Sequence, residues 1–190
     1  MAIDDDLQRY GSYLRDMTKR LARLYFEDAS YEAQEIPIDK ARDVYGYWVA
    51  MIIVAGSGLK TTLKAHFFSS PIKQHIAQKN NIDHASLSSS HDYIKEFLNL
   101  CAGKLKMEME SNKIDVGISL PLLMSGVDEL FYTASSQIVR CDKSWTLQGN
   151  GNISIIISQD TELSEASIFD KITLADPAAE SADDGEMDIL

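Results

Sequence analysis

A long uncharged stretch limits the folds open to this chain. Residues 44–55, Val-Tyr-Gly-Tyr-Trp-Val-Ala-Met-Ile-Ile-Val-Ala, contain no charged side chain. Aromatic and β-branched residues dominate the stretch, which favours a strand. Both faces of this strand are apolar, so both should be covered, one by helices and the other by a partner subunit. Residues 56–58 predict a turn, and residues 59–68 then alternate in polarity, so the two runs predict a β-hairpin.

The first residues of the chain predict an amphipathic helix over 3–27. Its apolar stripe has alternating spacings of three and four, at Leu7, Tyr10, Leu14, Met17, Leu21 and Leu24. Acidic residues begin this segment and basic residues end it, which suits the helix dipole. The stripe is short for a coiled coil, so we expect the helix to pack on the body of the protein. Residues 28–43 are polar, include Pro37, and are interpreted as a connector.

Two further helices and several strands complete the predicted fold. Ser70 and Pro71 suggest the start of a helix that ends near residue 79, with Ser70 as its N-cap. Ser89 and Asp92 have capping-box spacing before a longer helix over 89–110. We expect strands over 114–120, 134–141, 144–148 and 153–157, and a short helix or loop over 122–132. This order predicts an α+β fold, a largely antiparallel sheet with two central helices packed on it, plus the N-terminal helix.

Charge divides the chain into a nearly neutral body and an acidic tail. Residues 159–190 hold ten acidic residues and one basic residue, whereas residues 1–158 hold 19 acidic and 17 basic residues, within a total net charge of −11. The tail is therefore expected to be disordered, serving either solubility or the binding of a partner. The predicted organisation is an N-terminal helix and connector over 1–43, one domain over 44–158, and the tail over 159–190.

Composition also excludes several classes of function. No apolar run reaches the length of a membrane helix, and the acidic start does not resemble a secretory signal, so no membrane insertion is expected. Two cysteines make no disulfide framework, which favours a cytoplasmic protein. The negative net charge argues against nucleic-acid binding. The four histidines lack the spacing of a helical metal pair, so no metal site is expected.

The helix predicted over 89–110 has an unusual polar face. Ile94, Leu98, Cys101, Leu105 and Met109 form its apolar stripe, while Glu96, Asn99 and Gly103 lie on the opposite side, flanked by Leu100 and Met107. Glycine inside a helix costs about 1 kcal/mol relative to alanine, which usually has a packing or functional reason. This face is either a docking surface or an ordinary solvated face on which Gly103 fits against a neighbouring element.

The segment Asp-Tyr-Ile-Lys-Glu96-Phe-Leu-Asn99-Leu-Cys-Ala-Gly103-Lys resembles the signature helix of the CheX/CheC-type chemotaxis phosphatases, in which Glu-x-x-Asn precedes a short apolar stretch and Gly. The later Ile118-Ser-Leu-Pro121-Leu-Leu-Met-Ser-Gly126 is similar to the segment that follows that helix in the family. The resemblance covers residues 44–158. CheC-type members often carry two such motifs; this chain has one Glu-x-x-Asn and is therefore closer to CheX.

The resemblance implies a phosphatase for the phospho-aspartate of a response-regulator receiver domain, such as CheY, in chemotaxis or related two-component signalling. Asn99 would hold the attacking water and Glu96 would pair with the lysine of the receiver, while Leu100, Gly103 and Met107 would contact it. The chain itself would need no cofactor, because the receiver brings its own Mg²⁺. Relatives resembling CheX form dimers, so a homodimer is expected.

Two other functions stay open at this point. The same helix face could serve a non-catalytic adaptor that binds a receiver domain without turnover. Alternatively, the chain could be a dimerisation module in which the N-terminal helix makes the contact. Only turnover separates the phosphatase from the adaptor.

Overall fold

The computed structural model describes residues 2–37, 47–56, 58–126 and 139–163. Its elements, in chain order, are α1 (Ala2–Tyr25), β1 (Glu32–Ile36), β2 (Trp48–Gly56), β3 (Leu59–Phe67), α3 (Ser69–Asn80), α4 (Leu87–Ser111), β4 (Val116–Ile118), β5 (Leu122–Ser125), β6 (Val139–Gln148) and β7 (Ser154–Leu163). The strands form one antiparallel sheet in the order β1-β6-β7-β3-β2-β4, and β5 also pairs with β2. The predicted α+β class is confirmed.

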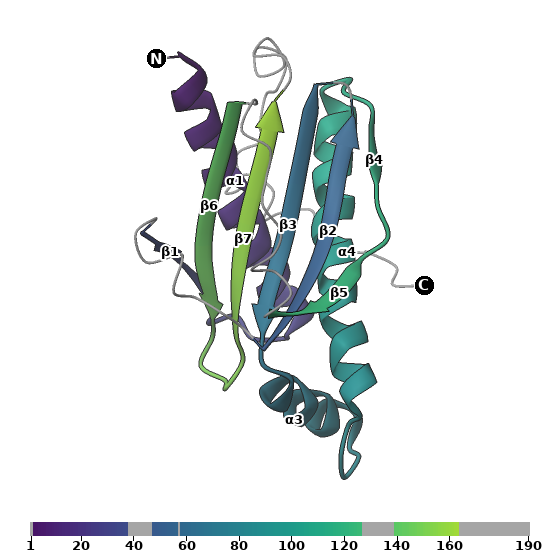
Figure 1. Cartoon of the computed structure of the whole chain (residues 1–190). Helices are drawn as coiled ribbons and strands as arrows, with labels where there is room; N and C mark the ends of the chain where they lie inside the picture. The colour runs from purple at the N-terminus through teal and green to yellow at the C-terminus, as the bar shows by residue number, and fades with distance from the viewer. Residues whose placement is uncertain (1, 38–46, 57, 127–138, 164–190) are drawn as a thin grey trace.

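The helices α1 and α4 lie on the same face of the sheet, and α3 lies beyond one of its ends (Figure 1). A single apolar core joins α1, α4 and the strands beneath them. The predicted hairpin is confirmed as β2 and β3, paired from Trp48 opposite Phe67 to Gly56 opposite Leu59. Residues 44–46, the start of the predicted strand, lie outside the described residues.

Both faces of β2 are buried over most of its length, as its composition predicts, and only its last two residues are exposed. Ala50, Ile52 and Val54 belong to the core beneath the helices, and Val49 and Met51 on the other face are also buried within the single chain. Burial of Val49 and Met51 therefore does not require a partner subunit, and the homodimer stays a prediction.

The helix α1 packs on the body of the protein, as expected. Its stripe from Leu7 to Leu21 is buried, but the prediction for Leu24 is wrong, because this side chain is 58% exposed. The helix ends at Tyr25 and the chain turns through Glu27, whose φ is 53°, so Phe26 is buried in place of Leu24. The predicted connector also contains a strand, β1, which pairs with β6 at the end of the sheet.

Two predicted helix caps were misplaced. The N-cap of α3 is Phe68 rather than Ser70, because β3 runs directly into the helix and leaves both serines inside the first turn. The N-cap of α4 is Ser86, whose hydroxyl accepts from the backbone N–H of Ser89 at 2.9 Å. Asp92 instead pairs with Lys95 at 2.7 Å.

The segment after α4 forms two short strands, not one strand followed by a helix or loop. β4 ends at Ile118, and Ser119 then bonds both backbone groups of Ile53: its N–H donates to the carbonyl at 2.8 Å, and its hydroxyl accepts from the N–H at 3.0 Å. Pro121 has no N–H to donate, and β5 resumes the pairing with β2 one residue later. Of the predicted helix or loop over 122–132, residues 127–132 lie outside the described part of the chain.

The last two strands are longer than predicted. β6 is continuous where two short strands were expected, and residues 134–138 are outside the described ranges. β7 extends to Leu163, so the first residues of the predicted acidic tail belong to the sheet. Gln159 and Thr161 are buried there, and Glu162 on the opposite face pairs with Lys60 at 3.2 Å. Among the helices of the described ranges, none combines the length and apolar character needed to span a bilayer.

Candidate functional site

The helix α4 is held against the sheet by the predicted apolar stripe. Ile94, Leu98, Cys101, Leu105 and Met109 have no exposed surface, and neither have Phe97 and Ala102 beside them. Burying a large apolar side chain contributes about 1.5 to 3 kcal/mol, so the helix is firmly anchored along its length. Its opposite face is consequently presented in a fixed orientation.

Glu96 and Asn99 lie side by side on that outward face. The side chain of Glu96 is exposed and that of Asn99 is half-buried, so neither is buried beneath α1. Asn99 Nδ2 donates a hydrogen bond to Glu96 Oε2 at 3.2 Å. The bond uses one of the two amide hydrogens, which leaves the second hydrogen and the carbonyl oxygen Oδ1 available for another group. The carboxamide is thus oriented while its acceptor stays available.

Gly103 stands in open space one turn further along α4. Beyond its own turn of the helix, a Cβ atom built on Gly103 would meet no atom of the described residues within 4 Å. Within the described part of the chain, Gly103 therefore does not fit against a neighbouring element. Met107 is 64% exposed and Leu100 is half-buried, so both predicted flanking residues reach this surface. The roles assigned to these residues stay predictions.

A pair of tyrosines fixes α4 one turn before Glu96. Tyr25, the last residue of α1, donates from its hydroxyl to the backbone carbonyl of Tyr93 at 2.8 Å, and the hydroxyl of Tyr93 donates to the carbonyl of Tyr25 at 3.2 Å. Their ring centroids are 4.6 Å apart. Neither residue was predictable from the sequence, because no local pattern relates positions 68 residues apart.

Burial keeps the ionisable groups behind this face protonated. Desolvation is the main cause that raises the pKa of Tyr25, and the negative charge of Glu96 adds to it. Tyr25 therefore remains a hydrogen-bond donor at neutral pH. Burial also raises the pKa of the Cys101 thiol, so this cysteine is a packing residue and not a nucleophile.

The face around Glu96 lies apart from two cavities of the protein. Two cavities border α3, and neither is lined by Glu96 or Asn99. No group of three or more His, Cys, Asp or Glu side chains in the described ranges is placed to hold a metal ion. The functional groups of this face are the oriented carboxamide of Asn99 and the carboxylate of Glu96.

Solved structures with a similar fold include three chemotaxis proteins. The CheC-like superfamily protein from Shewanella sp. PV-4 has a TM-score of 0.59 at 13% identity, over 83% of this chain and 97% of that one. CheX from Vibrio vulnificus has a TM-score of 0.58 at 14% identity, over 79% and 97% of the two chains. CheX from Borrelia burgdorferi, solved as a complex with CheY, BeF₃ and Mg²⁺, has a TM-score of 0.56 at 13% identity, over 82% and 98%.

This chain therefore has the fold of the CheX/CheC-type chemotaxis proteins, in agreement with the resemblance of its helix motif. No family model matches the sequence, and a search of curated proteins finds no match. The likeness therefore rests on the fold, and activity must be argued from the site itself.

Proposed function

We propose that this chain is a phosphatase that hydrolyses the phospho-aspartate of a response-regulator receiver domain, in chemotaxis or a related two-component pathway. The observation that carries this proposal is the hydrogen-bonded pair of Glu96 and Asn99 on the open face of α4. The CheX/CheC-type fold supports it, and so does the complex of one such protein with CheY.

Asn99 would position the attacking water. Its Oδ1 atom can accept a hydrogen from the water while the second hydrogen on Nδ2 donates, so one rigid amide can orient the nucleophile. The water oxygen forms a bond to phosphorus, the bond from phosphorus to the aspartate oxygen breaks, and inorganic phosphate and a free carboxylate result. Phosphoryl transfer depends mainly on such alignment and on charge stabilisation.

Glu96 would set the register of the two proteins. An exposed carboxylate can pair with the lysine that a receiver domain carries beside its phosphoryl group, and charge-assisted hydrogen bonds of this kind are both strong and directional. The second carboxylate oxygen, Oε1, would take the lysine, so the bond from Asn99 Nδ2 to Oε2 would stay in place. The amide would thus keep its orientation toward the water when the receiver docks.

The reaction would also need a metal ion from the receiver and a contact surface around Glu96 and Asn99. The receiver would supply Mg²⁺, so the chain itself needs no cofactor. Gly103 allows the receiver to approach the helix backbone, and Leu100 and Met107 offer apolar contact on either side. A homodimer working in the cytoplasm completes the proposal.

The test is the decay of a phosphorylated receiver domain in Mg²⁺ with catalytic amounts of this protein. We expect acceleration by the wild type and a loss of roughly 100-fold, or about 2.7 kcal/mol, in the Asn99→Ala variant. Glu96→Ala should mainly raise KM. Glu110→Ala is the matched control, because Glu110 is an exposed acid on the same helix, about 21 Å further along its axis.

The outcomes separate the proposed activity from the alternative. Equal rates for the wild type and Asn99→Ala would contradict the assignment of the water to Asn99. Saturable binding of a BeF₃-activated receiver with no acceleration of decay would leave a non-catalytic adaptor. Absence of both binding and turnover with every receiver encoded near this chain would reject both functions.

A further inference from the structure

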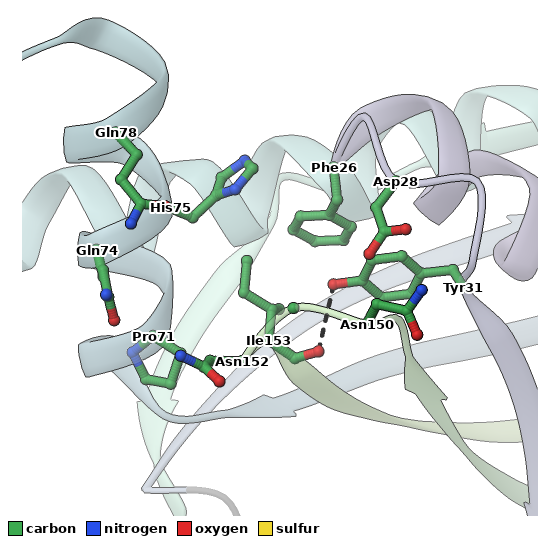
Figure 2. A pocket seen from close by; sticks show the side chains of 11 residues that line it. Phe26, Asp28, Tyr31, Pro71, Gln74, His75, Gln78, Asn150, Asn152 and Ile153 are labelled. Carbon is green, nitrogen blue, oxygen red and sulfur yellow. Dashed lines mark hydrogen bonds between the residues drawn. The ribbon is translucent and has the colours of Figure 1, made fainter.

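A polar pocket lies away from Glu96 and Asn99. Three segments that are distant in the sequence meet at this pocket. The turn between α1 and β1, the helix α3 and the turn between β6 and β7 enclose about 280 Å³. Figure 2 shows the α3 side chains Gln74, His75 and Gln78 on one side and Phe26, Asp28 and Tyr31 on the other. The proposed phosphatase uses none of these residues.

Hydrogen bonds and ring packing hold one side of the pocket, the side formed by the α1–β1 and β6–β7 turns. Tyr31 donates from its hydroxyl to the carbonyl of Ile153 at 3.3 Å, as Figure 2 marks, and its ring stacks on Phe26 with centroids 5.2 Å apart. The hydroxyl of Ser30 donates to Asp28 and accepts from the N–H of Asn150 at 2.7 Å, which ties the two turns together.

Gly149 makes this junction possible. A Cβ atom at this position would lie 2.3 Å from Asp28 Oδ2 and 2.8 Å from the ring of Tyr31. Any larger residue would push the β6–β7 turn away from the α1–β1 turn. The close contact between these two turns therefore shapes one side of the pocket.

The lining favours a neutral ligand rich in hydroxyl groups. Four carboxamides, of Gln74, Gln78, Asn150 and Asn152, offer donors and acceptors together, which is what a hydroxyl group requires. Asp28 is the one charged side chain of the lining, and hydrogen bonds from Ser30, Gly151 and Asn150 hold its pKa low. With a carboxylate and without lysine or arginine, the lining disfavours phosphates and other anions.

His75 adds an acceptor and connects the pocket to α4. Its Nε2 atom lies 3.0 Å from the hydroxyl of Tyr93, and that hydroxyl gives its single hydrogen to the carbonyl of Tyr25. Nε2 must therefore carry the imidazole hydrogen, which leaves Nδ1 as an acceptor. Burial lowers the pKa of His75, which keeps the ring neutral near pH 7.

We propose that this pocket binds a neutral, polyhydroxylated ring of monosaccharide size, and that occupancy is transmitted to Tyr93 through His75. The volume lies just below the range of roughly 300 to 1,000 Å³ of small-molecule sites, which fits a single sugar ring. Pro71 supplies a half-buried apolar edge for such a ring, above a floor formed by the nearly buried Phe26, Tyr31 and Ile153. Tyr93 precedes Glu96 by one helical turn, so the ligand would act close to the proposed catalytic pair.

The experiment is a titration of the full chain followed by NMR of its side-chain amides. D-ribose, D-glucose and myo-inositol are the probes, and inorganic phosphate and cadaverine are the charged comparisons. We expect saturable shifts at Gln78 and Asn152 with at least one neutral probe at millimolar concentration. Gln78→Ala and Asn152→Ala should each weaken binding about tenfold, the effect of one lost hydrogen bond.

Gln34→Ala is the matched control, since Gln34 is an exposed carboxamide on β1, outside the pocket. Thermal unfolding of each variant shows that the fold is retained. The binding proposal fails if no neutral probe gives saturable shifts, if both pocket variants bind like the Gln34→Ala variant, or if phosphate binds more tightly than the sugars.

The backbone amide of Tyr93 tests the transmission. Its signal should move with occupancy in the wild type and remain still in His75→Phe at a saturating probe concentration. If the chemical shift of the Tyr93 amide did not change on binding in the wild type, transmission through His75 would be rejected, and the binding result would be unaffected. These readouts do not depend on turnover, so the phosphatase proposal can fail without affecting them.

Discussion

Tyr25 and Tyr93 exchange hydrogen bonds, each donating from its hydroxyl to the backbone carbonyl of the other, at 2.8 and 3.2 Å. The arrangement joins the last residue of α1 to the turn of α4 that precedes Glu96. Tyr93 also contacts His75 of α3. The helices α1, α3 and α4 therefore meet at one side chain, immediately behind the candidate site.

Removing one hydroxyl at a time should show that the two bonds cooperate. Tyr25→Phe loses one hydrogen bond and should lower the free energy of unfolding by about 1 kcal/mol. Tyr93→Phe loses the contacts to both Tyr25 and His75 and should cost more. We expect the double variant to cost less than the sum of the single variants, measured by denaturant unfolding.

The phosphatase assay shows whether the two tyrosines also position Glu96 and Asn99 or only stabilise the fold. If they position the site, Tyr25→Phe and Tyr93→Phe should lower kcat at a temperature at which both variants remain folded. Strict additivity of the two stability losses, with unchanged kcat, would show that the tyrosines act independently and that neither positions the site.

Alanine at Gly103 should stabilise the fold and impair docking. The added Cβ meets no neighbouring atom within 4 Å in the ranges that the structure describes, so no clash there offsets the gain in helix propensity of roughly 1 kcal/mol. The same methyl group would stand between α4 and an approaching receiver. Thermal unfolding should therefore shift upward, while KM for the phosphorylated receiver should rise and kcat should change little.

A serine at Gly103 extends this test, because it adds bulk with a smaller gain in helix propensity. If Gly103→Ala stabilised the protein and left KM unchanged, the receiver would not approach this part of α4.

Stability should fall in alkaline solution because several tyrosines are buried. Burial raises the pKa of Tyr10, and the hydrogen bond to Thr61 only partly opposes this shift; burial also raises the pKa of Tyr93 to about 12. The unfolded chain loses these protons near pH 10, before the folded state does. The stability from the neutral hydroxyls is thus fully present below pH 10 and is lost as the pH rises through the folded values.

Denaturant midpoints between pH 8 and 11.5 measure this effect. In the Tyr10→Phe variant, the free energy of unfolding should fall less steeply above pH 10, by up to about 1.4 kcal/mol per pH unit. At neutral pH the cost should be small, because Thr61 keeps its contact with Thr161 at 3.3 Å. An unchanged slope in Tyr10→Phe would mean that other groups control alkaline unfolding.

Deleting α1 should abolish folding. Its Leu7, Tyr10, Leu14 and Met17 are almost fully buried, and each contributes about 1.5 to 3 kcal/mol, against a total of about 5 to 15 kcal/mol for a typical domain. We expect a chain lacking residues 1–27 to show no cooperative thermal transition. A cooperative transition with native helix content would show that α1 is an appendage, as a dimerisation module would require.

Local patterns predicted most of this fold. The stripe of α4 was predictable because five apolar residues recur at helical spacing, and the same arithmetic placed Glu96 and Asn99 on the opposite face. The β2–β3 hairpin was predictable because a glycine-rich turn separates two strand-like runs. In these segments local preference and tertiary packing agree.

The failures occurred where distant partners decide the structure. Glu32–Ile36 has the polarity of a loop and becomes a strand because β6 offers its backbone. Gln159 and Thr161 lie in an acidic context, yet they are buried in β7 since alternate side chains of a strand point to opposite faces. The Tyr25–Tyr93 pair and the pocket behind it depend on segments that only the fold brings together.

The bonds between Ser119 and Ile53 also bear on unwanted strand pairing at the edge of the sheet, which is distinct from the proposed homodimer. Leu120 and Leu122 are strongly exposed beside β2, where a continuous strand would invite pairing with another chain and aggregation. Ser119 instead takes up both backbone groups of Ile53, and Pro121 offers no N–H for pairing. The interruption between β4 and β5 therefore disfavours the addition of strands from other chains at this apolar edge of the sheet.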